Sequence, residues 1–219
     1  MKKTSLVLFL VIIGLMSGLV FAAGSEKNWP TILDLDVRNF EANVASLNLA
    51  SMNASLAANN FQPLTGPFWG FSGSSYLKNA PQNKLNFGLY TSQLFKSSLK
   101  GVKKAGFALQ SLGLMINRDF LGQGIIFSPK LVLGVAAVNL SLLHKASEEI
   151  YLEPREVIAK GIYLSGLAGV SLHYYLNEIV GLTASADLMG GYKLIQPIKD
   201  LNSFTGYKFG LGFVISLPI

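Results

Sequence analysis

The chain of 219 residues contains no cysteine, and this absence excludes several kinds of site at once. Disulfides, thiolate metal centres and lipid attachment through cysteine all require the missing side chain. Histidine is also scarce, since His144 and His173 are the two present, and neither lies among carboxylates with metal-ligand spacing. The sequence therefore predicts no catalytic, cofactor-binding or metal-binding residue, and no cofactor.

A long apolar run is the second missing feature. A helix that spans a bilayer needs roughly 18–20 apolar residues in succession, and no stretch beyond residue 22 approaches that length. The best candidate, residues 131–143, is shorter and includes Asn139 and Ser141. Only helices and closed barrels satisfy their backbone hydrogen bonds inside lipid. An exported apolar chain without such a helix is therefore expected to be a barrel.

The first 22 residues have the order of a secretory signal peptide. Two lysines precede an apolar run over residues 6–13, and small residues follow up to Ala22. We expect cleavage after Ala22, which leaves one domain, residues 23–219. An uncleaved membrane anchor is the alternative, although glycine and serine interrupt the apolar run.

Residues 207–217 alternate between two kinds of side chain. Every odd-numbered residue is large and apolar, whereas the even-numbered residues are Lys208, glycine, valine and serine. Successive side chains of a strand point to opposite faces of a sheet. A soluble sandwich has its bulk inside and its charge outside, while a barrel in lipid has the reverse layout. The alternation thus predicts a strand of a membrane barrel.

Similar alternation recurs along the chain. Residues 158–176 and 180–188 alternate on either side of the polar pair Asn177-Glu178, which is typical of a β-hairpin. Weaker alternating segments lie at 33–38, 68–77, 85–90, 107–116 and 131–138. We predict an all-β fold, a closed antiparallel up-and-down transmembrane β-barrel of about eight strands, with ten as the alternative. Segment 41–66 shows neither the alternation of a strand nor the spacing of an amphipathic helix, and it is expected to be a long loop, a helix or an internal plug.

The connections between these segments differ in length. Short breaks are expected at 78–84, 117–124 and 177–178, and longer ones at 41–66, 92–104, 141–157 and 190–205. Bacterial barrels have short periplasmic turns and longer external loops. The pattern predicts that both termini lie in the periplasm and that the long loops lie outside the cell.

The hairpin Leu172-His173-Tyr174-Tyr175-Leu176-Asn177-Glu178-Ile179-Val180-Gly181-Leu182 resembles small bacterial outer-membrane β-barrel proteins of the eight-stranded type. An aromatic pair precedes a short polar turn, and a Gly-Leu pair opens the next strand. The resemblance implies insertion into the cell outer membrane by a barrel-assembly machinery that reads the last strand. Membrane lipids and that machinery are the implied partners, and nucleic acid is not expected. The ending Leu217-Pro218-Ile219 departs from the aromatic ending usual in that class.

Ser171 and His173 share one face of a predicted strand, and Glu178 or Asp187 could orient the histidine. The resemblance implies that lipid hydrolases and acyltransferases of the outer membrane act at the outer leaflet, whereas His173 is expected near the periplasmic turn. We therefore predict that the protein is not an enzyme, with a lipid hydrolase or acyltransferase as the alternative. His144 is expected to be a solvated loop residue.

The interior of an eight-stranded barrel is just wide enough to be filled by side chains or by one small ligand. Residues predicted to line this lumen are Tyr163, Ser171, His173, Asp187 and Lys208. We predict a structural or surface-interaction role rather than a wide porin. The alternatives are a barrel that binds or passes a small apolar ligand or solute, and a soluble periplasmic lipocalin-like barrel. The lysines at 96, 100, 103 and 104 are expected in a solvated loop or against anionic lipid head groups.

Overall fold

The computed structural model describes residues 34–79, 85–122, 124–144, 157–195, 198 and 200–218. The predicted signal peptide and most of the predicted loop 141–157 lie outside these residues. The elements are β1 (Asp34–Asn48), α2 (Ala50–Ala58), β2 (Phe68–Asn79), β3 (Leu85–Lys100), β4 (Lys103–Arg118), β5 (Phe120–Leu121), β6 (Ile125–His144), β7 (Val157–Tyr175), β8 (Val180–Ile195) and β9 (Ser203–Pro218).

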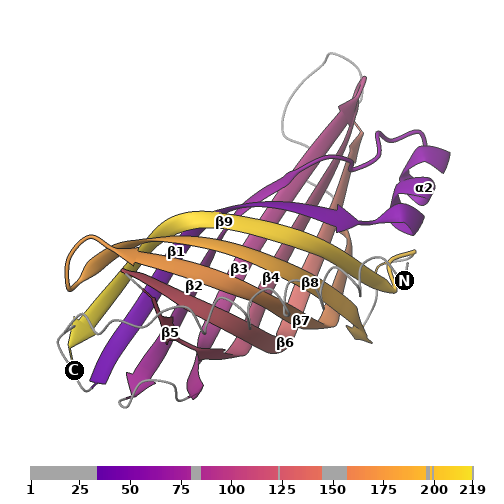
Figure 1. Cartoon of the computed structure of the whole chain (residues 1–219). Helices are drawn as coiled ribbons and strands as arrows, with labels where there is room; N and C mark the ends of the chain where they lie inside the picture. The colour runs from indigo at the N-terminus through magenta and orange to yellow at the C-terminus, as the bar shows by residue number, and fades with distance from the viewer. Residues whose placement is uncertain are drawn as a thin grey trace, which may run out of the picture.

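Eight long antiparallel strands close into a barrel (Figure 1). Sequential neighbours pair along most of the wall, β1 pairs with β9, and the pairing of β4 with β6 completes the ring. The two-residue β5 pairs with β6 beside the ring. The predicted closed eight-stranded barrel is confirmed.

The hydrogen-bond register fixes the shape of this barrel. Directly paired residues, followed from Arg38 around all eight strands, lead back to β1 at Asn48, ten residues further along. With an ordinary strand rise and spacing, this stagger tilts the strands by about 40° from the barrel axis. Such a barrel is narrow, so its inward side chains meet across the interior.

The two ends of the barrel differ. The helix end carries α2, and the terminal end carries the start of β1 and the end of β9 (Figure 1). At the helix end β3 and β4 meet in the two-residue turn Gly101-Val102, so the predicted long loop at 92–104 is wrong. The turn is this short because Gly101 adopts a φ of 58°, which glycine reaches without strain.

The segment predicted as a loop at 41–66 divides into two parts. Residues 41–48 continue β1 and pair with β9, so the excursion from the wall starts later than expected. The remainder contains α2, which is the helical alternative, followed by residues 59–67, here called the strap.

The outer wall is apolar, with Leu114 and Leu211 exposed by 68% and 71%. In water such a wall would form a large exposed apolar patch, which soluble monomers avoid. The soluble lipocalin-like alternative therefore does not fit. Within the described ranges no helix is long and apolar enough to cross a membrane.

Candidate functional site

A buried charge network occupies the middle of the interior. Lys208 on β9 and Asp187 on β8 are register partners, and Lys208 Nζ lies 3.0 Å from Asp187 Oδ2. Lys130 on β6 reaches the same carboxylate from the far side of β7, with its Nζ 3.1 Å from Oδ1. The side chains of Lys208 and Asp187 are fully buried. One carboxylate thus holds two ammonium groups.

Hydroxyl groups connect this triad to a second carboxylate. Lys208 Nζ donates hydrogen bonds to Tyr90 Oη at 2.6 Å and to Ser72 Oγ at 3.3 Å. Ser72 and Ser185 in turn donate to Glu41 Oε2, at 3.2 and 2.7 Å. We call Glu41, Lys130, Asp187 and Lys208 the charge network. Its two carboxylates balance its two ammonium groups, as buried charges require.

Two glycines make room for these side chains. A Cβ on Gly169, which pairs with both Lys130 and Asp187, would collide with Asp187 Oδ1. A Cβ on Gly210 would lie 2.5 Å from Glu41 Oε2 and 2.6 Å from Ser185 Oγ. These two glycines therefore mark where carboxylate side chains of the network cross the barrel.

A second polar layer lies towards the terminal end. Ser128 Oγ and Asn117 Nδ2 donate to Asp119 Oδ1 at 2.5 and 3.1 Å. Tyr175 and Ser216 share a hydrogen bond of 2.6 Å. These contacts fill the interior below the charge network with polar side chains.

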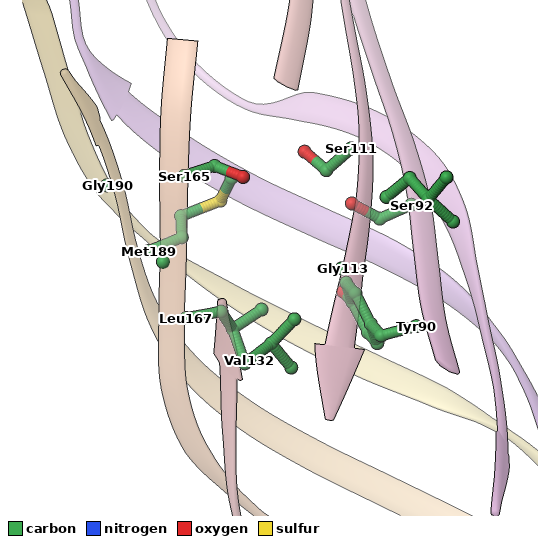
Figure 2. Close-up of a pocket in the computed structure, with 11 residues that line it drawn as sticks. Tyr90, Ser92, Ser111, Gly113, Val132, Ser165, Leu167, Met189 and Gly190 are labelled. Atoms are coloured by element: carbon green, nitrogen blue, oxygen red, sulfur yellow. The ribbon is translucent and has the colours of Figure 1, made fainter. Parts of the chain in front are cut away.

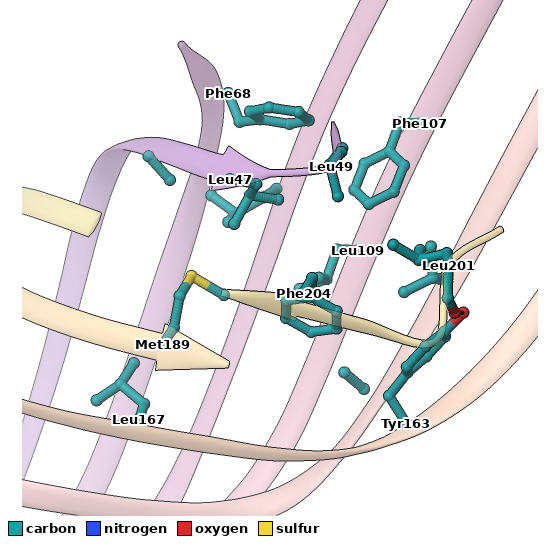
Figure 3. Packing of buried hydrophobic residues seen from close by; sticks show 14 of the residues in the cluster. Leu47, Leu49, Phe68, Phe107, Leu109, Tyr163, Leu167, Met189, Leu201 and Phe204 are labelled. Carbon is teal, nitrogen blue, oxygen red and sulfur yellow. Dashed lines mark hydrogen bonds between the residues drawn. The ribbon is translucent and has the colours of Figure 1, made fainter. Parts of the chain in front are cut away.

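The helix end of the interior is apolar instead. Phe68 and Phe107 make an edge-to-face contact with ring centroids 5.5 Å apart, and Tyr163 packs in the same way on Phe204 at 5.7 Å (Figure 3). We call this cluster the apolar cap; its buried members include Leu47, Leu49, Met52, Leu56, Phe61, Leu64, Phe68, Leu94, Phe107, Leu109, Tyr163, Leu201 and Phe204. The cap lies between the charge network and the helix end.

Side-chain hydrogen bonds fix the two connections that complete the cap. Asn53 of α2 accepts from the Leu64 amide at 2.8 Å and donates to the Leu64 carbonyl at 3.4 Å. Tyr163 Oη donates to the Leu201 carbonyl at 2.8 Å and accepts from the Ile198 amide at 3.2 Å. The first pair of contacts joins α2 to the strap, and the second holds residues 198 and 201 to β7.

The lysine cluster lies on strands rather than in a loop. Three of the lysines hold the strap and the end of α2: Lys96 Nζ donates to the Pro67 carbonyl, Lys100 Nζ to Asn60 Oδ1 and Lys103 Nζ to the Asn59 carbonyl, at 3.1, 2.7 and 3.2 Å. Lys104 faces outward from β4 and is exposed. The expectation of a solvated loop is therefore wrong for this cluster.

A cavity of about 20 Å³ lies beside the network, lined in part by Ser92, Ser111, Ser165 and Met189 (Figure 2). Its size suits one water molecule, because roughly 10–15 Å³ suffices for a water. Pockets for organic ligands are an order of magnitude larger, roughly 300–1,000 Å³. In the described part of the chain no group of three or more histidines and carboxylates could hold a metal ion.

All five residues predicted to line the lumen are buried in the interior. Asp187 and Lys208 meet in the charge network, whereas Tyr163 belongs to the apolar cap. Ser171 Oγ accepts a hydrogen bond from Lys130 Nζ at 3.0 Å. Ser171 and His173 are 3% and 1% exposed, so a lipid substrate has no access to them.

The sequence analysis does not predict two members of the network, Glu41 and Lys130, or their neighbour Tyr90. Glu41 lies in the segment predicted as a loop, helix or plug, and Tyr90 lies in a predicted strand with no role assigned. Lys130 stands two residues before Val132, so extending the alternation of β6 backwards would have placed it inside. The available signal was a charged residue at a position that the strand alternation places on the inward face.

This architecture is that of a small eight-stranded outer-membrane β-barrel, and solved structures agree. The attachment invasion locus protein Ail of Yersinia pestis, in complex with the heparin analogue sucrose octasulfate, matches with a TM-score of 0.52 at 12% identity, over 84% of this chain and 99% of that one. A major outer membrane protein from Thermus thermophilus matches at 0.49 and 12% identity, over 82% and 99%. Neisserial surface protein A matches at 0.44 and 18%, over 85% and 98%.

The match to Ail shows a shared fold, and its 12% identity leaves the family unidentified. No protein-family model matches the chain. No curated protein matches it either.

Proposed function

We propose that this protein is a closed outer-membrane barrel that acts through its surface, in a structural or interaction role. The observation that carries the proposal is the filled interior, in which the apolar cap lies above a balanced charge network. A path for ions would have to cross the cap, whose apolar side chains offer no replacement for an ion's hydration shell. The helix end, with α2 and the strap, then faces the exterior, and the termini lie in the periplasm.

Planar-bilayer recording tests this proposal. The purified barrel is expected to give no conductance steps, whereas steady single-channel steps in the wild type would refute a closed scaffold. Membrane fractionation with a heat-modifiability gel checks the location, and recovery in the soluble periplasmic fraction would contradict it. The predicted signal peptide can be checked in the same samples by sequencing the mature N-terminus.

The alternative of a barrel that binds or passes a small apolar ligand finds little support. The cavity described above has room for one water, and its walls are strands that cannot part without breaking the ring. A role as a lipid hydrolase or acyltransferase meets the same obstacle, because Ser171 and His173 lie inside the wall. The proposal therefore excludes catalysis at these two residues.

A second candidate function is the binding of a sulfated or phosphorylated polyanion at the helix end. In the sequence, segments 92–104, 141–160 and 190–205, which hold the connections and strand ends on this side, carry eight lysines and one arginine against five acidic residues. Ail, which shares the fold, was solved with sucrose octasulfate. Such an excess of positive charge attracts anions in a salt-dependent way.

Titration with sucrose octasulfate tests the second candidate. The outward lysines are the ones to replace, because Lys104 and Lys160 are exposed and take no part in holding the strap. Lys104→Gln with Lys160→Gln is expected to weaken binding about tenfold, and Arg118→Gln at the terminal end serves as the matched control. Equal affinities for the two variants would contradict binding at the helix end.

A further inference from the structure

The apolar surface of the outer wall has two very different heights. On β9 the outward residues are large and apolar from Tyr207 to Leu217, eleven residues. On β1, its direct neighbour, the outward apolar run covers only Phe40 to Val44, five residues, and ends at Arg38 and Ser46. At about 2.5 Å of height per tilted residue, these runs are about 27 Å and about 12 Å tall.

Polar residues also interrupt the outward faces of the neighbouring strands. On β3 the outward Thr91 and Gln93 separate the apolar Leu85, Phe87 and Leu89 from the apolar Phe95 and Leu99, and on β4 the outward apolar run ends at Gln110. On β2 the polar Ser75 interrupts an outward row that otherwise consists of Trp69, Phe71, Gly73 and Leu77. The outward runs of β6, β7 and β8, in contrast, continue for more than ten residues, over 125–137, 162–176 and 180–194.

An outer-membrane barrel needs an apolar band of about 25 Å all around. The β6–β9 half of the wall provides it, whereas the β1–β4 half would expose Arg38, Thr91 and Gln93 at the depth of the lipid chains. Polar side chains at that depth are costly unless a protein partner covers them. We infer that the β1–β4 half of the wall is a docking face, and that a second copy of this chain occupies it.

The second copy follows from the geometry of a membrane and from the groups on the face. Two copies inserted in the same direction can be related by a two-fold axis only along the membrane normal, so equal heights meet across the interface. At each height, the groups on the face must then be complementary to the same groups on the second copy. A face with charge of one sign at any height would repel its own copy.

Two sets of polar groups on the face meet that condition, whereas the outward Arg118 and Lys104 of β4 add positive charge that opposes association. Towards the terminal end the face carries an ion pair, because Arg38 Nη2 lies 2.6 Å from Asp36 Oδ2. Half of the Arg38 side chain is exposed, so its remaining N–H groups can reach the partner's carboxylate. Towards the helix end stand Gln93 and Gln110, which are register partners and carry both donors and acceptors.

The middle of the face permits close approach. Ala42 and Gly73 are small and lie between the larger Phe40 and Phe71, which supply apolar anchors. Small residues with interhelical or interstrand polar contacts are the usual means of association in lipid, where apolar burial gives little gain. The face thus combines a shallow centre, apolar anchors and self-complementary polar groups.

Oxidative cross-linking tests the docking face, and the lack of native cysteine makes the chain suitable. Gly73→Cys puts a thiol at the centre of the face, where an added Cβ would have its nearest neighbour at 3.5 Å. Gly166→Cys on β7 is the matched control, outward and equally open with a nearest neighbour at 3.7 Å. Copper phenanthroline in native outer membranes is expected to give a band of twice the monomer mass with Gly73→Cys and not with Gly166→Cys.

Energy transfer between labelled copies in phospholipid vesicles supplies the second measurement. With single labels at Asp200→Cys, transfer is expected to persist on dilution with lipid, and Gln93→Leu with Gln110→Leu is expected to weaken association about tenfold. Transfer that falls to the random level for the unsubstituted face, or an equal cross-link from both glycine positions, would overturn the inference. A cross-link to a protein of another mass would overturn the second copy as the occupant.

Discussion

Replacing Asp187 with asparagine is expected to be the most damaging single change in the interior. The substitution keeps the shape of the side chain and removes the one carboxylate that Lys130 and Lys208 share, at 3.1 and 3.0 Å. Two buried ammonium groups then lose their ion-pair partner at once. Removing one partner of a buried ion pair costs about 3–5 kcal/mol, so we expect at least that loss in the free energy of unfolding.

The complementary change, Lys208→Met, separates this reasoning from simple packing. Methionine fills a similar volume, and Asp187 keeps Lys130 as its partner. The network is then left with two carboxylates and one ammonium group, and the hydrogen bonds to Tyr90 and Ser72 are lost, so we expect a cost at the lower end of the same range, about 3 kcal/mol. Removal of the carboxylate should therefore cost clearly more than removal of the ammonium group.

Urea unfolding in vesicles, followed by the shift of the folded band on a gel, measures these differences. Asp200→Asn at the exposed helix end is the control, because it makes the same chemical change outside the interior and should stay within about 0.5 kcal/mol of the wild type. If Lys208→Met destabilises the barrel as much as Asp187→Asn, the shared carboxylate is not what holds the network together.

Two further changes test how the interior is built. Gly169→Ala should destabilise the barrel by about 1–3 kcal/mol because its Cβ meets Asp187 Oδ1. The control, Gly166→Ala, should be nearly neutral because its Cβ would have its nearest neighbour at 3.7 Å. Urea unfolding compares the two variants, and equal losses of stability would reject the steric explanation. Asn53→Ala removes both hydrogen bonds to Leu64 and should reduce the local stability of the strap by about 1–2 kcal/mol. We expect faster proteolysis of the strap and unchanged unfolding of the barrel. An unaltered cleavage rate would show that the lysines alone hold the strap.

The strands of the β6–β9 half could be predicted from sequence, because there the lipid requires apolar residues outside and leaves small or polar residues inside. The same rule failed where the wall serves another purpose. Gln93 and Ser97 break the apolar alternation and so favour the loop predicted at 92–104, yet residues 92–100 are paired in β3. The strand at residues 41–48 was not predicted because the outward Ala42 and Val44 are only small apolar residues beside the inward Glu41 and Asn43.

The charge network could be predicted only in part. Asp187 and Lys208 stand at inward positions of clear strands, so their side chains were expected inside. Their contact depends on the register of β8 against β9, which alternation does not give. Lys130 and Glu41 join them through the closure of the barrel, which brings β6 and β1 to the same interior although they are far apart in sequence.

The arrangement of the interior and that of the outer wall lead to the same conclusion about where this protein acts. The charges lie at the level where the wall passes through the membrane, and the apolar cap separates them from the helix end, so the low-dielectric surroundings strengthen each ion pair. We propose that this interior, in the part of the chain that the structure describes, gives a solute no route or site. Contacts with other molecules must then be made by the outer surfaces, at the helix end or on the β1–β4 face.

These two surfaces adjoin, because the lysine-bearing turn between β3 and β4 belongs to the half of the wall that would dock. Association through that face would place two basic tips side by side, where their mutual repulsion opposes the dimer and a bridging polyanion would relieve it. By thermodynamic reciprocity, a polyanion that favours the dimer must itself bind the dimer more tightly than the monomer.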